Sequence, residues 1–206
     1  MAHNITMDKN TLDRLRARAS QHFLDSIAVK LEAEKMLPSE IARGIVAMAD
    51  CLRSGGKVMA CGNGGSAADA QHFAAELIGR FERERQELAA IALTTDSSIL
   101  TAVGNDYSYD EVFTKQVRGL GKRGDILLAI STSGNSKNVV KAIESAKKLG
   151  IKVIALTGNG GGKIATLLDA DDIHLCAPST RTARIQETHL VLLHSLCDGL
   201  DHLLLD

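Results

Sequence analysis

The segment Lys57-Val-Met-Ala-Cys-Gly-Asn-Gly-Gly-Ser66 joins a short apolar run to a glycine-rich turn. The run from Lys57 to Cys61 predicts a β-strand, and the pattern of residues 66–81 predicts a helix directly after the turn. Glycine lets a ligand approach the backbone closely, and the first N–H groups of a helix can hold an anion. We therefore expect an α/β fold with a ligand near this turn, although the segment alone agrees equally well with a tight connection that binds nothing.

Apolar runs and helical patterns alternate along the rest of the chain. Strands are expected at residues 89–93, 125–130, 152–156 and 172–176, and helices at residues 136–149 and 181–204. The runs lack the polar–apolar alternation of a half-exposed strand, which indicates a parallel sheet with helices on both faces. Because ligands of such sheets bind beyond the carboxyl ends of the strands, the turns after Cys61 and after Ile130 mark the expected site.

Two further helical patterns, at residues 10–35 and 41–52, precede the first strand. Pro38 marks the break between them. Their apolar stripes require a partner, which is either the sheet of the same chain or a second subunit, and the pattern leaves both open. We expect an N-terminal helical extension at residues 1–54 and an α/β domain at residues 55–206.

The composition excludes several classes of protein. The chain has 206 residues with 24 basic and 25 acidic side chains, so it lacks the positive field of a general nucleic-acid binder. No apolar run approaches the roughly 20 residues that span a bilayer, and the polar stretch Met1–Asn10 lacks the apolar core of a signal peptide. The four cysteines (Cys51, Cys61, Cys176 and Cys197) form no C-x-x-C pair. We expect a cytoplasmic protein with reduced thiols.

The segment Ser131-Thr-Ser-Gly-Asn-Ser136 lies between an expected strand and an expected helix. The unpaired N–H groups and the dipole of a helix N-terminus favour a phosphate group. Serine and threonine are also ordinary N-caps, but a cap needs one hydroxyl and this turn offers several. We therefore expect a phosphate site at this turn. Its hydroxyl groups come from Ser131, Thr132, Ser133 and Ser136.

His72 and Glu76 lie at positions i and i+4 of the helix expected at residues 66–81, so they share one face of it. Imidazole and carboxylate groups bind Zn²⁺ and similar divalent ions, and a buried carboxylate can act as a general base. Taken alone, such a pair is more often an exposed surface contact. The C-terminal helix carries further polar side chains, namely Arg184, Gln186, Glu187, His189, His194 and His202. Spacing alone does not choose between His189 and His194.

Asn105 and Asp106 are expected in a polar turn between apolar segments. Both residue types are common in turns, so a contact with sugar hydroxyl groups is only weakly indicated there.

Taken together, the motifs resemble the sugar isomerase (SIS) domain family, and within it the bacterial phosphoheptose isomerases. The matching segments are Cys61–Ser66, Asp69–Phe73 with Glu76, Val103–Asp106, Ile130–Ser136, Ala155–Gly158, and Arg184–Glu187 with His189 and His194. The resemblance implies a three-layer αβα domain with a five-stranded parallel sheet. It also implies a homotetramer with active sites at the subunit interfaces, in which the N-terminal helices serve oligomerisation.

The same resemblance implies an activity. The family group converts D-sedoheptulose 7-phosphate to D-glycero-D-manno-heptose 7-phosphate through an enediol, the first step toward the heptose of lipopolysaccharide. Glu76 would be the base and His194 its acid–base partner. One Zn²⁺ per subunit would be held by His72, Glu76, Gln186 and His194. Substrate contacts would come from Asn63, Gly64, Gly65, Glu76, Asn105, Asp106, Ser131, Thr132, Ser133, Ser136 and Gln186.

Two other interpretations stay open at the level of sequence. A related SIS-domain group forms non-catalytic tetramers that bind the bacterial replication initiator protein, and Ala183–Glu187 matches that group too. It lacks equivalents of Glu76 and His194, both of which this chain keeps. A sugar-phosphate sensor would need the turn at residues 131–136 but neither of those two residues. One departure from the isomerase pattern is Ala183, where some members of the group carry an acidic residue.

Overall fold

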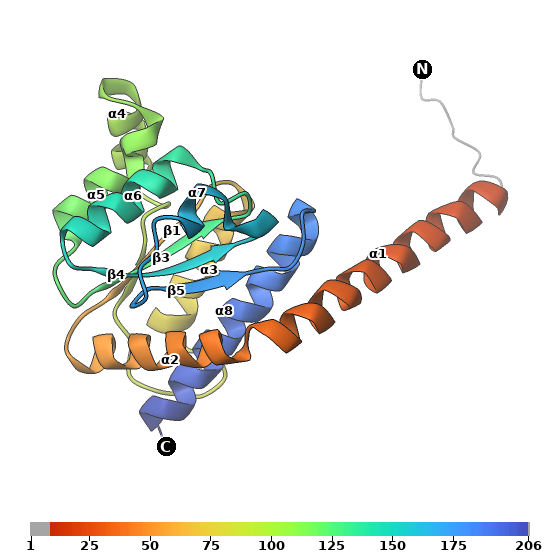
Figure 1. Ribbon diagram of the computed structural model, residues 1–206, viewed down its shortest axis with the longest axis horizontal. Helices are drawn as coiled ribbons and strands as arrows, with labels where there is room; N and C mark the ends of the chain where they lie inside the picture. Colours follow the sequence, from red (N-terminus) through yellow and green to blue (C-terminus); the bar gives the residue numbers. More distant parts are fainter. Residues whose placement is uncertain (1–8, 206) are drawn as a thin grey trace.

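The computed structural model describes residues 9–205, and its centre is a parallel β-sheet (Figure 1). Its five strands lie in the order β2-β1-β3-β4-β5, and every neighbouring pair is parallel. The strands are β1 (Val58–Cys61), β2 (Ala90–Ala92), β3 (Ile126–Ser131), β4 (Lys152–Thr157) and β5 (Ile173–Cys176). Each overlaps the apolar run that predicts it, so the expected five-stranded parallel sheet is confirmed. Residues 1–8, with most of the polar N-terminus, lie outside the described residues.

Helices cover both faces of the sheet, which confirms the expected three layers. The helices are α1 (Lys9–Met36), α2 (Pro38–Arg53), α3 (Gly65–Ile78), α4 (Ser97–Asp106), α5 (Val112–Leu120), α6 (Lys137–Lys148), α7 (Gly162–Ala165) and α8 (Thr182–Leu205), with 3-10 turns η1 (Tyr109–Glu111) and η2 (Asn159–Gly161). Side chains of a strand alternate between its faces: Val58 and Ala60 pack with α2, α3 and α8, while Met59 and Cys61 pack with α5 and α6.

Some helices have no counterpart in the sequence pattern, and α4 is the one that matters for the site. Asn105 and Asp106 are its last two residues, so the expectation of a turn there is wrong. The helix has no fully buried residue, and its few apolar residues (Ile99, Leu100 and Val103) give only a short periodic pattern. It begins instead with a local cap, in which the carboxylate of Asp96 accepts a hydrogen bond of 2.9 Å from the N–H of Ile99.

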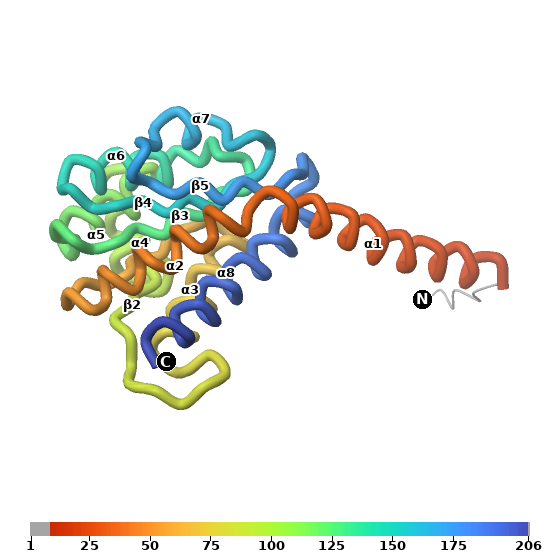
Figure 2. Tube along the Cα trace, turned by 60° about the horizontal axis from the view of Figure 1, so that its bottom comes forward, coloured from red at the N-terminus to blue at the C-terminus, as the bar shows by residue number. Residues whose placement is uncertain are grey.

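The two N-terminal helices find different environments. α2 packs against α8, and its residues Met48, Ala49 and Cys51 belong to the same core as the sheet. α1 instead projects away from the body of the molecule (Figures 1 and 2), and Ala33 is its buried residue. Its exposed apolar side chains are Leu12, Leu15, Phe23, Leu24, Ile27, Leu31 and Met36. Thus α2 meets its partner within the chain, whereas the apolar stripe of α1 is left open. The domain boundary after residue 54 stays a prediction.

Although α1 and α8 are long, no helix of residues 9–205 has the length and apolar character needed to cross a membrane.

Candidate active site

The two glycine-rich turns lie side by side at the carboxyl edge of the sheet. β1 and β3 are neighbours, with Cys61 paired to Ala129, so the turns that follow them leave the sheet next to each other. Gly64 has a φ of 56° directly before α3, a conformation that suits glycine. The amide group of Gln186 lies against Gly65, in space that a Cβ atom would occupy. This turn therefore needs glycine for its backbone and for the approach of α8.

Two side-chain amides join the turns. Asn63 Nδ2 donates to Asn138 Oδ1, and Asn138 Nδ2 donates to Asn63 Oδ1, each over 2.8 Å. The hydroxyl of Tyr109 also donates to Asn63 Oδ1, over 3.3 Å. Neither Asn138 nor Tyr109 is predicted from the sequence. The available signal for Asn138 is its place among the apolar residues of α6, where an amide requires a polar partner.

The hydroxyl-rich turn keeps its side chains free of helix capping. Ser136 occupies the N-cap position of α6 but makes no capping hydrogen bond; its Oγ instead lies 3.0 Å from Oγ of Ser131. Gly134, with a φ of 66°, packs so closely on Gly161 that no Cβ fits between them. This packing holds the turn in place. The first N–H groups of α6 remain available as donors to an anion.

α3 and α8 bring the predicted acid–base residues together. Gln186 lies beside Gly65, and the ring of His194 meets the ring of His72 with their centroids 5.2 Å apart, so the two helices run alongside each other in the same direction. His72 Nε2 lies 2.7 Å from Glu76 Oε1, and both side chains are partly exposed. Residues more than a hundred positions apart thus form one polar cluster next to the glycine turn.

Asn105 and Asp106 stand apart from the other predicted residues. Both are exposed at the end of α4, where Asn105 Nδ2 donates to Asp106 Oδ1 over 2.9 Å. Among the described residues, no hydrogen bond links either of them to the turns or to the histidine cluster. The segment reaches the site through Tyr109 instead.

Comparisons with known proteins identify the family. The sequence model of the SIS-domain family matches residues 22–158. The chain is 65% identical to the phosphoheptose isomerase of Dechloromonas aromatica over 93% of this chain and 97% of that protein. The chain belongs to the SIS-domain family, in its phosphoheptose isomerase group.

Solved structures agree with this assignment. The phosphoheptose isomerase from Neisseria gonorrhoeae is 55% identical, with a TM-score of 0.87 over 91% of this chain and 99% of that one. A phosphoheptose isomerase from Francisella tularensis has the same TM-score of 0.87 at 47% identity, over 93% of this chain and 98% of that one. The fold is therefore that of the solved phosphoheptose isomerases.

The donor set for a divalent ion is present in this SIS-domain protein, although its atoms do not converge on one point. Among residues 9–205, no group of three or more His, Cys, Asp and Glu side chains is arranged to hold a metal. His72 Nε2 and Glu76 Oε1 face each other directly. Gln186 belongs to α8 and lies beside Gly65, the first residue of α3, which is about 10 Å along the axis of α3 from His72. Imidazole, carboxylate and amide oxygen nevertheless suit Zn²⁺ by their chemistry. Zinc stays a prediction.

The structure distinguishes His189 from His194 by environment. His189 is fully buried, and its Nε2 lies 2.8 Å from the carbonyl oxygen of Thr157, to which the neutral ring donates. Burial lowers the pKa of His189 to about 4. His194 is partly exposed and lies between the rings of His72 and Phe81. His189 therefore holds the end of β4 to α8, while His194 faces the polar cluster.

A buried ion pair fixes the far end of α3 in the SIS domain. Arg85 Nε lies 2.6 Å from Asp201 Oδ1 of α8. The same guanidinium donates to the carbonyl oxygens of Glu76, over 2.7 Å, and Leu77, over 2.9 Å. These contacts satisfy carbonyl groups that a helix end leaves unpaired. Arg85 thereby ties the helix of Glu76 to the helix of His194.

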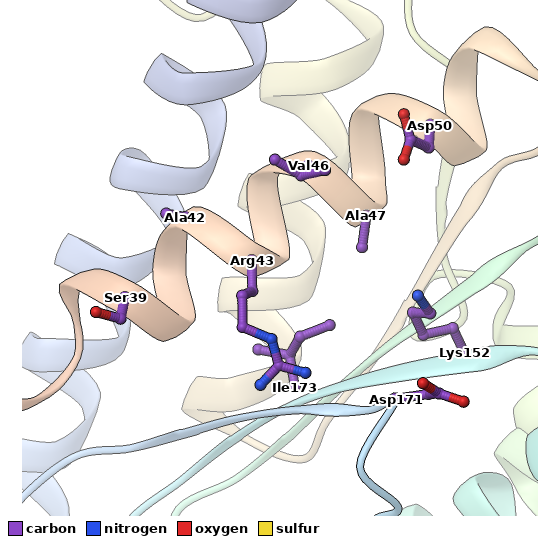
Figure 3. A pocket seen from close by; sticks show the side chains of 9 residues that line it. All are labelled: Ser39, Ala42, Arg43, Val46, Ala47, Asp50, Lys152, Asp171 and Ile173. Carbon is purple, nitrogen blue, oxygen red and sulfur yellow. The ribbon is translucent and has the colours of Figure 1, made fainter.

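A separate hollow of about 440 Å³ lies at the opposite edge of the sheet (Figure 3). It is lined by α2 and by residues at the starts of β4 and β5, including Arg43, Lys152 and Asp171. None of the predicted site residues borders it. Since ligands of parallel sheets bind at the carboxyl ends of the strands, we place the active site at the other edge.

Proposed function

We propose that this protein isomerises D-sedoheptulose 7-phosphate to D-glycero-D-manno-heptose 7-phosphate. The observation that carries the proposal is the meeting of His72, Glu76 and His194, from two helices, beside a glycine turn and a hydroxyl-rich helix N-terminus. The similar proteins reported above bear the name phosphoheptose isomerase at 47–65% identity over almost their whole length. The non-catalytic alternative and the sensor would not need Glu76 or His194, and no observation favours them.

The reaction exchanges hydrogen atoms between neighbouring carbon and oxygen atoms. A base removes a proton from C1 of the ketose, which leaves an enediol once the C2 carbonyl oxygen has gained a proton. Return of a proton to C2 and loss of the O1 proton give the aldose, so no net oxidant or reductant is needed. We assign the carbon proton to Glu76 and the oxygen protons to His194. The hydrogen bond of His72 to Glu76 orients the carboxylate for this transfer.

The phosphate group of the substrate would be held by the turn at residues 131–136. Its serine and threonine hydroxyl groups and the N-terminus of α6 offer donors suited to a dianion. Anchoring the end of the sugar away from the reaction positions C1 and C2 at the α3–α8 cluster. Asn63, Gly64, Gly65 and Gln186 would contact the sugar between the two.

We infer that a divalent ion, with Zn²⁺ the best match, binds His72, Glu76, Gln186 and His194. When bound it would polarise an oxygen atom of the substrate. A carboxylate held firmly by a metal is a poor base, so the role of Glu76 as a ligand would compete with its role as the base.

The assembly and location follow from the same proposal. The exposed apolar stripe of α1 and an apolar groove of about 410 Å³ between α1, α2 and α8 support a homotetramer with active sites at its interfaces. The cysteines are free, which supports a location in the reducing cytoplasm.

Turnover provides the test. Purified protein is incubated with sedoheptulose 7-phosphate, with and without added Zn²⁺, and the aldose product is followed by NMR. We expect the aldose to accumulate and the rate to fall after chelation. No aldose from protein that contains Zn²⁺ would contradict the proposed function.

A further inference from the structure

Asn138 is a buried polar side chain on the apolar face of α6. It is 3% exposed, and its neighbours Val139 and Val140 belong to the core. Burying an amide costs free energy unless its donors and acceptors are paired. The partners of the Asn138 amide are the backbone of Val139 and the side chain of Asn63, a predicted substrate contact.

The backbone determines which way both amides point. The N–H of Val139 donates to the Asn138 amide over 3.0 Å. Because a peptide N–H can only donate, the accepting atom must be the oxygen of that amide. The nitrogen of Asn138 therefore faces Asn63 as a donor, so Asn63 presents its oxygen to that nitrogen and its own nitrogen to the oxygen of Asn138.

The Asn63 amide has one hydrogen-bonding group left for a ligand. Its Oδ1 accepts from Asn138 Nδ2 and from the hydroxyl of Tyr109, which fills both lone pairs. One hydrogen of its Nδ2 goes to Asn138 Oδ1. A single N–H is left, on a side chain that is only half-buried. A ligand that meets the Asn63 amide therefore meets a donor and no acceptor.

We propose that Asn138 is a positioning residue that turns the Asn63 amide so that this second N–H donates to an oxygen atom of the sugar phosphate. The inference rests on the proposed function, because it assigns a role to Asn63 in that same site. It also restricts the contact: the substrate atom must accept, as a carbonyl, hydroxyl or phosphate oxygen does. Asn138 acts through Asn63 and need not touch the substrate.

Steady-state kinetics with sedoheptulose 7-phosphate test the link. Asn138→Leu keeps the size of the side chain and removes its hydrogen bonds, and Asn63→Ala removes what Asn138 positions. We expect each variant to raise KM roughly 3- to 10-fold, as expected for one hydrogen bond, with kcat changed less than about 2-fold because the bond is present in ground and transition states alike. The double variant should have the KM of Asn63→Ala alone. Ala142→Gly, which loosens the same helix at another buried position, should leave KM unchanged.

An unchanged KM in either single variant, or effects that multiply in the double variant, would overturn the proposal. NMR of the Asn63 side-chain amide separates this failure from a failure of the proposed function, since it needs no turnover. In the wild-type protein one N–H should exchange slowly with solvent, and the other should shift when sedoheptulose 7-phosphate is added. Asn138→Leu should abolish the slow exchange. Equal exchange in both proteins, or no shift on adding the sugar phosphate, would also refute the positioning.

Discussion

Glu76 is held from two directions at the point where α3 meets α8. Its carboxylate accepts a hydrogen bond of 2.7 Å from His72 Nε2, and its carbonyl oxygen accepts a hydrogen bond from Arg85. The side chain is thus oriented while its backbone is tied, through Asp201, to the helix of His194. Contacts within the chain therefore fix both the side chain and the backbone of Glu76.

Replacing Glu76 by glutamine should therefore lower the rate of catalysis and leave the fold unchanged. Glutamine keeps the size and can still hydrogen-bond to His72, but it cannot take a proton from carbon. We expect kcat to fall by about 10²- to 10⁴-fold, with the circular dichroism spectrum and the oligomeric mass unchanged. Glu84→Gln, at an exposed glutamate, is the matched control and should keep full activity. A Glu76→Gln variant with normal turnover would remove Glu76 from the base role.

His189 and His194 show why the sequence alone cannot assign every residue. The two lie five positions apart on α8, and their spacing is compatible with a role for either. What separates them is contact with residues far away in the chain, namely Thr157 for His189 and His72 for His194. Burial is set by tertiary packing, so only the family resemblance favoured His194 before the structure was known.

Burial of His189 also predicts a pH dependence of stability. The pKa of His189 is about 4 in the folded protein and about 6.5 in an unfolded chain, so the unfolded state binds more protons between these values. Stability is therefore complete above pH 6.5 and declines as the pH falls toward 4. From pH 7.5 to pH 5 the loss should be about 2 kcal/mol for this residue. Burial lowers the pKa of His174 too, which adds to the decline.

Urea unfolding at a fixed protein concentration measures this effect. His189→Gln retains a donor for the carbonyl group of Thr157 but does not titrate. The free-energy difference between wild type and variant should shrink by about 2 kcal/mol between pH 7.5 and pH 5. A difference that is independent of pH would show that His189 is not kept neutral by its burial.

The strands and the long helices follow from the sequence, and the short helices α4, α5 and α7 do not. Each strand overlaps its apolar run, and α6 and α8 begin and end within two residues of their expected limits. α4 has no fully buried residue, and α7 is a single turn started by consecutive glycines with positive φ, so their periodic signal is weak or absent. α5 is buried but short, and its buried Thr114 and Gln116 interrupt the apolar pattern. α3 ends at Ile78 rather than Phe81, because Gly79 and the contacts of Arg85 close the helix. The two turns that build the site were predictable because they end such strands.

The hydroxyl-rich turn is the element whose role is most directly tested. It is held in place from behind, since the N–H of Lys163 donates to Asn135 Oδ1 over 2.9 Å and the N–H of Ile164 to the carbonyl of Gly134 over 2.9 Å. Ser133→Ala combined with Ser136→Ala removes two donors to the phosphate and keeps both of these hydrogen bonds, although the bond from the N–H of Asn135 to Ser133 Oγ is lost. We expect KM to rise about 10-fold or more, with a smaller effect on kcat.

Ser145→Ala, in the body of α6, is the matched control for this double variant and should not change KM. Inorganic phosphate should also inhibit the wild-type protein more strongly than the double variant, because both bind phosphate through the same turn. Equal inhibition, together with an unchanged KM, would show that another part of the molecule anchors the phosphate.

At the scale of the whole molecule, α1 is an arm that contacts the rest of the chain through its middle and its C-terminal end and is exposed along most of its length (Figure 2). Arg181 pairs with Asp25 over 2.9 Å, and Arg184 donates to the backbone and ring of His22, so the middle of the helix is held to the start of α8. Phe23, next to these contacts, is 72% exposed. A large apolar side chain beside a fixed polar anchor is expected in an interface that another subunit completes.

The homotetramer proposed above would sediment as four copies of the 22.0 kDa chain. Phe23→Glu with Ile27→Glu places two charges on the exposed stripe and should convert the tetramer to smaller species, because burying unpaired carboxylates in an interface is costly. Arg14→Glu lies nine residues before Phe23, about 180° around the helix, and as the matched control it should keep the tetramer. Turnover should fall with the loss of the tetramer if the active sites lie at its interfaces. A stripe variant that remains a tetramer would assign the interface to another surface, and one that dissociates with full activity would place each active site within a single subunit.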